Sequence, residues 1–300
     1  MPGTGESWRS SVRPVDEPRA NDAQAAYWES RAAGWMDAET ISSSIVGDPF
    51  GDVAIERLAP AGGERLLDVG CGTGPTTQQI ARIVAPGGTV TGADIAPAMV
   101  AAAAERARAA GVDNATFVVA DAQTADLGSD SYDAVFSRFG VMFFSDPVAA
   151  FANIRAALRP GGRVVFACWQ ELLRNEWMFV PGAAAIAASG QPPNMPEPGA
   201  PGPFSLCEPQ RVRTVLGDAG FSKVELDDVR REVVVSEAGM DGFLQGLSRM
   251  GAVREQLELF ADDPAMRERI LGAVRDELSG RVGGGELRLT SAAWVVSARA

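Results

Sequence analysis

Three glycines stand within five positions of the segment LLDVGCGTGPTT, residues 66–77, just after a short apolar run that contains Asp68. Glycine weakens regular structure through backbone entropy, so a cluster of it behind a strand indicates either a turn with unusual dihedral angles or a ligand held against the main chain. Pro75 suits the first turn of a helix. The segment therefore predicts a tight strand-to-helix turn, and the rest of the chain decides between the two reasons for it.

Short β-branched segments alternate with Ala-rich segments from residue 64 onward. Expected strands cover 64–70, 88–95, 115–122, 132–140 and 162–169, and expected helices begin after Pro75, after Pro97 and near residue 148. Strands that alternate with helices form a parallel sheet with helices on both faces. The pattern therefore predicts an α/β fold.

The two ends of the chain follow other patterns. Residues 1–20 are polar and contain Pro and Arg, so we expect a disordered leader ahead of a single domain, residues 21–300. Residues 21–39 have a helical pattern in which Trp28 and Trp35, seven positions apart, share one face. Further strands are expected at 222–236 and 286–300, with helical structure between 239 and 279.

Charge and composition argue against several kinds of partner. The formal net charge is -12, whereas nucleic-acid binding depends on clustered Lys and Arg. No apolar run reaches the roughly 20 residues of a membrane span, and the N-terminal segment lacks a signal-peptide core, so we expect a cytoplasmic protein. The chain has no histidine and three scattered cysteines, so we predict neither a metal site nor a disulfide framework. A small molecule is the expected partner.

Four loops are expected at the carboxyl ends of the strands, where ligands bind in such sheets: 70–75, 94–96, 121–123 and 137–139. The glycine turn offers backbone N–H groups to a carboxylate or phosphate. Asp94 can accept hydrogen bonds from both hydroxyls of a ribose, and Asp121 with Ala122 and Gln123 can contact the edge of a purine. Together they predict a site for a nucleoside with an anionic or zwitterionic tail.

Each feature alone has a simpler explanation. The glycine turn could occur without a ligand, Asp94 could cap the helix that begins near Pro97, and Asp121 could be a solvated loop acid. Their occurrence at three successive strand ends favours one shared ligand.

Five segments follow one another at these positions: ERLLDVGCGTG, VTGADIAPAMV, FVVADAQT, YDAVFSRFGVMFFSDP and LRPGGRVVFACW. They resemble the successive motifs of class I S-adenosylmethionine-dependent methyltransferases, in the branch of the ubiquinone and menaquinone C-methylating enzymes and many small-molecule enzymes. The resemblance covers roughly residues 21–235. It implies a seven-stranded Rossmann-like sheet with helices on both faces and an inserted cap, and S-adenosylmethionine as the cofactor.

The resemblance also implies the roles of individual residues. Around the methionine part of the cofactor it places Asp68, Gly70, Cys71 and Gly72. It assigns Asp94 to the ribose, Ile95 and Met99 to the faces of the adenine, Asp121, Ala122 and Gln123 to its edge, and Ser137 and Arg138 to the sulfonium side. Tyr27 and Trp35 are similar to the Tyr and Trp that glycine- and sarcosine-type methyltransferases fold over the methionine tail. The alternative is that these two rings only pack the helix on the sheet, while Trp28 belongs to the core or the wall of the substrate pocket.

Two later segments, about 170–206 and 236–284, fall where this family inserts its substrate cap. The first contains six prolines between Pro192 and Pro203. The apolar residues expected to line an acceptor pocket are Trp169, Trp177, Met178, Phe179, Met195, Phe204, Phe243, Leu244 and Met250. We therefore expect a partly apolar small-molecule acceptor.

The expected reaction is methyl transfer by in-line displacement at the sulfonium methyl group, with alignment and desolvation providing most of the acceleration. Without histidine, a base would be a carboxylate, Tyr27, Cys168 or water. A nicotinamide oxidoreductase would favour a GxGxxG turn, and a nucleic-acid methyltransferase would need a basic face. A protein that binds the cofactor but regulates or cyclises without methylating remains the alternative. The acceptor, the atom methylated and the oligomeric state are left open.

Overall fold

The computed structural model describes residues 21–42, 48–193 and 199–300. The predicted leader at 1–20 and the predicted pocket residue Met195 lie outside these ranges. Seven strands form one sheet in the order β3-β2-β1-β4-β5-β7-β6. Their bounds are β1 (Arg65–Val69), β2 (Thr89–Asp94), β3 (Ala115–Val119), β4 (Tyr132–Arg138), β5 (Leu158–Trp169), β6 (Ser222–Ser236) and β7 (Glu286–Arg299). The predicted seven-stranded α/β fold is confirmed.

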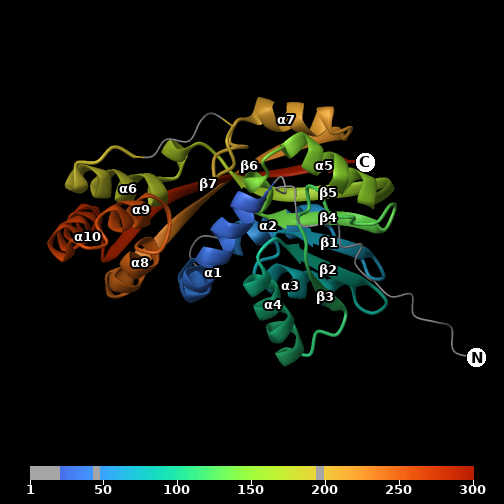
Figure 1. Cartoon of the computed structure of the whole chain (residues 1–300), viewed down its shortest axis with the longest axis horizontal. Helices are drawn as coiled ribbons and strands as arrows, with labels where there is room; N and C mark the ends of the chain where they lie inside the picture. Colours follow the sequence, from blue (N-terminus) through green and yellow to red (C-terminus); the bar gives the residue numbers. More distant parts are fainter. Residues whose placement is uncertain (1–20, 43–47, 194–198) are drawn as a thin grey trace, which may run out of the picture.

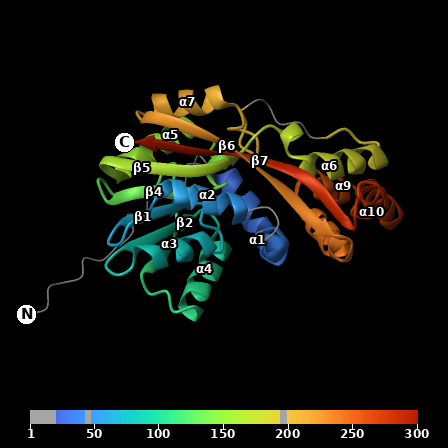
Figure 2. The same ribbon diagram turned by 180° about the vertical axis from the view of Figure 1, so that it is seen from behind.

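Helices lie on both faces of the sheet (Figures 1 and 2). They are α2 (Asp48–Leu58), α3 (Pro75–Val84), α4 (Pro97–Ala109), α5 (Pro147–Ala157) and α7 (Pro209–Asp218). Four of them begin with proline, because proline's fixed φ suits the first helical turn and its missing N–H is not needed there. The Asp146 side chain caps α5 by accepting from the Ala149 N–H at 3.0 Å. Sequence patterns predicted α3, α4 and α5, whereas α2 and α7 were not predicted.

β7 alone runs against its neighbours: it is antiparallel to both β5 and β6, while the pairs among β1 to β5 are parallel. Its last half pairs with β5 from Ala293 to Arg299. Its first half pairs only with β6, so the two strands continue as a ribbon past Trp169, the end of β5. The ribbon reaches beyond the ligand-binding edge expected for a parallel sheet.

A group of four helices packs at the far end of this ribbon (Figures 1 and 2). They are α6 (Glu176–Ser189), α8 (Met240–Leu247), α9 (Gly251–Leu259) and α10 (Pro264–Ser279), and α6 packs against both α9 and α10. Asn175 fixes the start of α6, since its side chain accepts from the Ala292 N–H at 2.9 Å and donates to the Ala292 carbonyl oxygen at 3.1 Å. The helical extension is thereby tied to the ribbon at its base.

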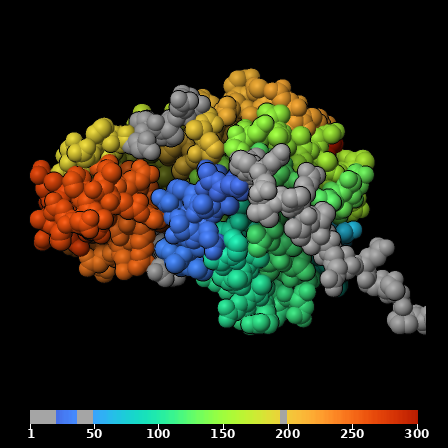
Figure 3. Space-filling model, in the orientation of Figure 1, coloured from blue at the N-terminus to red at the C-terminus, as the bar shows by residue number. Residues whose placement is uncertain are grey.

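Helix α1 (Asp22–Ser42) lies between the sheet and this helical extension, as the space-filling view shows in blue (Figure 3). One face packs on the start of α4, where Ala32 is buried together with Ala96 and Met99. The helix also contacts α8 of the extension. Its position links the two parts of the molecule.

Candidate functional site

The strand order reverses at β1, which has β2 on one side and β4 on the other. The loops after β1 and β4 therefore diverge from adjacent strand ends, which is where ligands bind in sheets of this kind. At this point the two loops touch: a Cβ on Gly70 would lie 2.9 Å from the Gly140 Cα, and a Cβ on Gly140 would lie 2.9 Å from the Val69 carbonyl oxygen. Gly70 is thus required by the packing of the protein itself.

Glycine occupies the three positions of the turn for different structural reasons. Gly74 has a φ of 83°, and a Cβ there would come within 2.8 Å of the Phe117 ring. Gly72 has a φ of 54° but no atom within 4 Å of the place where its Cβ would be. Packing explains Gly70 and Gly74, whereas at Gly72 the positive φ favours glycine and, among the described residues, no atom occupies the space beside it.

Asp94 joins the glycine turn to the loop after β2. Its carboxylate accepts from the Gly72 N–H at 2.8 Å and from the Ala96 N–H at 3.0 Å, and burial raises its pKa. The N-cap of α4 is Ala96, and it makes no side-chain cap hydrogen bond. Asp94 therefore does not have the helix-capping role that was its simplest alternative.

Asp68 is buried directly before the turn. Its carboxylate accepts from the Thr77 hydroxyl at 2.6 Å. Burial raises the pKa of Asp68 to about 7, although the Thr77 hydrogen bond and the positive charge of Arg138 oppose this shift. A carboxyl with such a pKa gains a charge cheaply when a cationic group binds beside it.

Asp121 and Gln123 belong to a hydrogen-bond network that the sequence did not predict. The buried Asn21 donates to the Asp121 carboxylate at 2.9 Å and to the Gln123 side-chain oxygen at 3.2 Å, and accepts from the Ser145 N–H at 3.1 Å. The Gln123 oxygen also accepts from the Asp146 N–H at 3.0 Å. β3 ends at Val119, so Asp121 follows the strand at a short distance. The network fixes the start of α1 to the loops after β3 and β4, and no local signal marks a contact between residues a hundred positions apart.

The Trp28 ring contacts both Tyr27 and Trp35, with ring centroids 5.4 and 5.8 Å apart, so Trp28 and Trp35 share one face as predicted. The Trp28 ring packs edge-on against Phe143, with ring centroids 4.8 Å apart. Tyr27 and Trp35 are 39% and 38% exposed, and the Arg31 guanidinium lies over the Tyr27 ring at 3.7 Å. Trp28 therefore packs against the segment after β4, while Tyr27 and Trp35, the two rings expected to fold over the methionine tail, are only partly covered.

The remaining predicted residues differ in burial and in the elements that they contact. Cys71 and Ala122 are buried, Ile95 is half-buried, and Met99 is buried beneath α1. Ser137 is fully buried and its hydroxyl accepts from the Gly140 N–H at 3.3 Å. Arg138 passes close to α2, where a Cβ on Gly51 would lie 3.0 Å from its Cδ. Gly51 and Gly140 are further residues that shape the site and were not identified from the sequence.

Aromatic rings gather where β4 and β5 end. Phe139, with a φ of 61°, stacks on Trp169 with ring centroids 3.9 Å apart and an angle of 13° between the planes. Phe50 packs edge-on against both rings. Trp177 adjoins Trp169 at 5.6 Å, is 6% exposed, and its indole N–H has no hydrogen-bond partner. We call Phe50, Phe139, Trp169 and Trp177 the aromatic wall. Its member Phe139 immediately precedes Gly140, the residue that touches Gly70.

The other residues expected to line an acceptor pocket are dispersed. Phe243 and Leu244 are buried, whereas Phe179 is 40% exposed. Met178, Phe204 and Met250 pack against the core from its edge. Cys168 is buried, its thiol donates to the Leu206 carbonyl oxygen at 3.6 Å, and burial raises its pKa. The thiol therefore stays protonated at neutral pH and is not available to take a proton from the acceptor.

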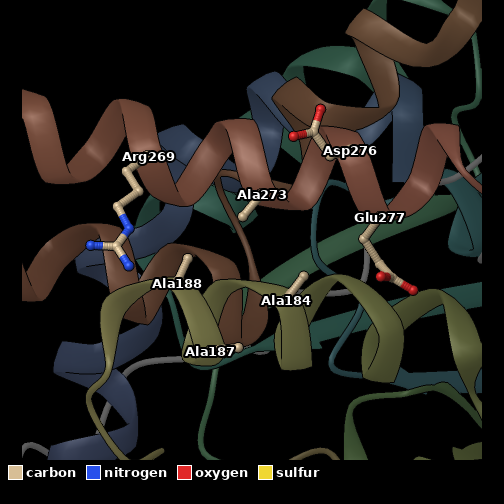
Figure 4. Close-up of a pocket in the computed structure, with 7 residues that line it drawn as sticks. All are labelled: Ala184, Ala187, Ala188, Arg269, Ala273, Asp276 and Glu277. Atoms are coloured by element: carbon tan, nitrogen blue, oxygen red, sulfur yellow. The ribbon is translucent and has the colours of Figure 1, made fainter.

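A surface hollow of about 570 Å³ lies elsewhere, between α6 and α10 (Figure 4). It is lined by Ala184, Ala187, Ala188, Arg269, Ala273, Asp276 and Glu277. In the part of the chain described, no cluster of three or more His, Cys, Asp or Glu could hold a metal ion. Within the same residues, no helix is long and apolar enough to cross a membrane.

The features at the strand ends fit a nucleoside cofactor with an amino-acid tail. Gly72 leaves room against the backbone, Asp68 is a buried carboxyl beside it, and Asp94 lies at the end of the next strand. A zwitterionic tail needs both backbone N–H groups and a carboxylate. The fit supports the cofactor expected from the sequence motifs.

Comparison with known proteins leads to the same region. Residues 66–162 match the family model described as "Methyltransferase domain". The chain is 37% identical over 118 residues to the aklanonic acid methyltransferase DauC of Streptomyces sp. (strain C5), covering 39% of this chain and 54% of that protein. It is 30% identical over 209 residues to the O-methyltransferase cnsE of Penicillium expansum, covering 69% of this chain and 67% of that protein.

Among solved structures, the fold is similar to that of the [4+2]-cyclase SpnF, with a TM-score of 0.52 and 25% sequence identity. The match covers 84% of this chain and 80% of that chain. The sheet, the strand-end loops and the sequence motifs thus agree with one another.

Proposed function

Because the chain belongs to the class I S-adenosylmethionine-dependent methyltransferases, we propose that it transfers the methyl group of this cofactor to a flat, partly apolar small molecule. The observation that carries the proposal is the open position at Gly72, whose N–H donates to the half-buried Asp94. Gly72 stands two residues after Gly70, which touches the loop after β4 that carries Phe139. This arrangement brings a cofactor site and an apolar surface to one edge of the sheet.

The bound cofactor would supply a methyl group that is already electrophilic because it is attached to a sulfonium sulfur. The residues of the chain bind and orient. The open space beside Gly72 and the carboxyl of Asp68 receive the amino-acid tail, and Asp94, which already accepts from the Gly72 N–H, also accepts from the ribose hydroxyls. Aligning the acceptor atom with the methyl group and excluding water provide most of the acceleration.

The aromatic wall gives the acceptor its expected shape. Phe139, which is half-buried, stacks on Trp169, which is 8% exposed, and we propose that a planar acceptor packs against the accessible part of Phe139. Among the described residues the buried indole N–H of Trp177 has no hydrogen-bond partner, and we propose that it donates to an oxygen of the bound acceptor. The proposed acceptor is therefore a planar molecule with at least one oxygen near Trp177.

Replacing Asp94 with Asn should weaken binding of S-adenosylhomocysteine by about 1 to 3 kcal/mol, because the amide loses an acceptor for the ribose hydroxyls. Calorimetric titration measures this. Asp126→Asn is a matched control, since Asp126 makes the same local bond, to the Gly128 N–H at 2.9 Å, on an exposed loop. Equal affinities for both variants would remove the ribose role from Asp94.

The activity is tested by incubating the purified chain with isotopically labelled S-adenosylmethionine and fractionated metabolite extracts. A labelled product and an equal amount of S-adenosylhomocysteine are expected. With the product identified, Trp177→Phe should raise KM for the acceptor about two- to tenfold and leave cofactor affinity unchanged, since it removes one hydrogen bond and keeps the ring system largely in place. No cofactor binding at millimolar ligand would contradict the proposed function.

A second candidate function is cyclisation without methyl transfer. The likeness to the [4+2]-cyclase SpnF over most of both chains favours it as the alternative. In that case the aromatic wall would hold a folded substrate, and the cofactor would remain intact. A product of unchanged mass, formed without S-adenosylhomocysteine, would select this alternative.

A further inference from the structure

A second hollow, of about 240 Å³, lies between α1 and the helical extension. Its lining comes from α1, from the turn after α8, from α9 and from the beginning of α10. The lining residues are Ser30, Arg31, Gly34, Ser248, Arg249, Arg254, Leu257, Glu258 and Arg267. We call this hollow the arginine pocket.

The arginine pocket is positively charged in an acidic protein. Its lining includes four arginines and one carboxylate, and Glu255 lies close enough to interact with Arg31 and Arg254, so positive charges still outnumber negative ones, whereas the whole chain carries a formal charge of -12. Glu258 is shared by two of the arginines: it lies 2.6 Å from the Arg254 Nε and 3.8 Å from the Arg31 guanidinium. Like charges gathered in a partly enclosed space repel one another, and an anion that binds there relieves the repulsion.

The guanidinium groups are suited to an oxyanion. Each presents planar N–H donors that match the geometry of a carboxylate, and one is oriented by the protein itself, since Arg267 donates to the Leu257 carbonyl oxygen at 2.7 Å. Arg31 and Arg254 are only about a quarter exposed, at 23% each. Partly desolvated charges of this kind interact with an anion more strongly than fully exposed ones.

The arginine pocket and the cofactor site adjoin the same helix, α1. Arg31 and Tyr27 are neighbours on one face of α1, with the guanidinium 3.7 Å from the ring. Ala32, the next residue, lies about 100° further round the helix and packs on Ala96 and Met99 just after the Asp94 loop. The pocket and the cofactor loops therefore border neighbouring faces of α1, so that one molecule can extend along this side of the helix towards both.

We propose that the arginine pocket binds the carboxylate, or a similar oxyanion group, of the acceptor. The acceptor is then an organic acid whose apolar rings lie towards the aromatic wall and whose acidic group lies between α1 and the extension. That the bound anion is part of the methyl acceptor rests on the proposed function. The anion site itself rests only on the charges and geometry of the pocket.

The test uses the full chain saturated with S-adenosylhomocysteine and two probes, 3-hydroxy-2-naphthoate and its neutral carboxamide, titrated by calorimetry. The acid should bind at least tenfold more tightly than the amide. Arg254→Gln should weaken binding of the acid about three- to tenfold, and Glu258→Gln should strengthen it. Both variants lose the same ion pair, so a purely structural role would move them in the same direction.

Arg269→Gln is the matched control. It also removes one arginine charge from the helical extension, but Arg269 is on α10 and lines the hollow of Figure 4 instead of the arginine pocket. It should leave the affinity for the acid unchanged. Competition with inorganic phosphate tests whether the naphthoate carboxylate occupies the arginine pocket. If it does, phosphate should displace the naphthoate. Phosphate that binds with the same charge dependence but does not displace naphthoate would overturn the assignment to the acceptor.

Equal affinities for acid and amide, parallel effects of Arg254→Gln and Glu258→Gln, or no binding of either naphthoate or phosphate would each overturn the proposal. Failure of the proposed function has a different signature. In that case S-adenosylhomocysteine does not bind, while phosphate still binds to the arginine pocket with opposite responses in the two variants.

Discussion

Gly72→Ala is expected to lower the affinity for S-adenosylhomocysteine at least about tenfold while the protein stays folded. The place that its methyl group would occupy contains no protein atom, so the folding cost is limited to the left-handed backbone, about 1 kcal/mol. The loss of affinity arises because the new methyl group fills the space proposed for the amino-acid tail. Calorimetric titration with S-adenosylhomocysteine gives the affinity, and urea unfolding gives the stability.

Gly70→Ala is the matched variant two residues earlier, and it should act mainly on folding. Its Cβ would lie 2.9 Å from the Gly140 Cα, a backbone atom that moves only with its loop. Overpacking together with a φ of 69° should lower the free energy of unfolding by about 2 to 4 kcal/mol. If Gly72→Ala bound the cofactor as tightly as the unaltered protein, the open position would have no ligand-binding role.

Asp68→Asn is expected to become more stable relative to the unaltered protein as pH rises. The difference in their free energies of unfolding should grow by up to about 4 kcal/mol between pH 4 and pH 8. The folded-state pKa of Asp68 is raised to about 7 by burial, from 3.8, so between these values the folded protein keeps a proton that the unfolded chain has lost. Stability from this group is therefore lost as pH rises from about 4 to 7. Asn has the same shape, does not ionise, and still accepts from Thr77.

The measurement is urea unfolding of both proteins at several pH values between 4 and 8, because their difference removes the contributions of all other carboxyls. A second readout follows from the proposed function. The cationic amino group of the cofactor should bind more tightly as Asp68 ionises, so affinity should rise with pH up to about 7 and stay flat in Asp68→Asn. A stability difference that does not vary with pH would mean that the folded-state pKa is ordinary.

Local patterns in the sequence were enough for much of the sheet. The strands β1, β2 and β4, the helices that begin at Pro75 and Pro97, and the order of the strand-end loops were predicted, because proline, glycine and β-branched residues act within a few positions of where they stand. The family and its cofactor followed from the same short motifs. The roles of the individual site residues remain predictions.

The tertiary structure decided what depends on contacts between distant residues. It separated Gly72 from Gly70 and Gly74, since only the positions of Gly140 and Phe117 reveal which glycine faces open space. It showed Asn21 bound to Asp121 across a hundred positions, and it brought Arg31 to Glu258 in the arginine pocket. Periodicity along the chain reports which face of an element is buried, but not which distant element covers it, because that depends on how the whole chain packs. The sequence by itself therefore determined the order of the elements, including the strands at 222–236 and 286–300 with helices between them, and the class of cofactor. Packing determined the aromatic wall, the extension of the paired strands beyond the sheet and the arginine pocket.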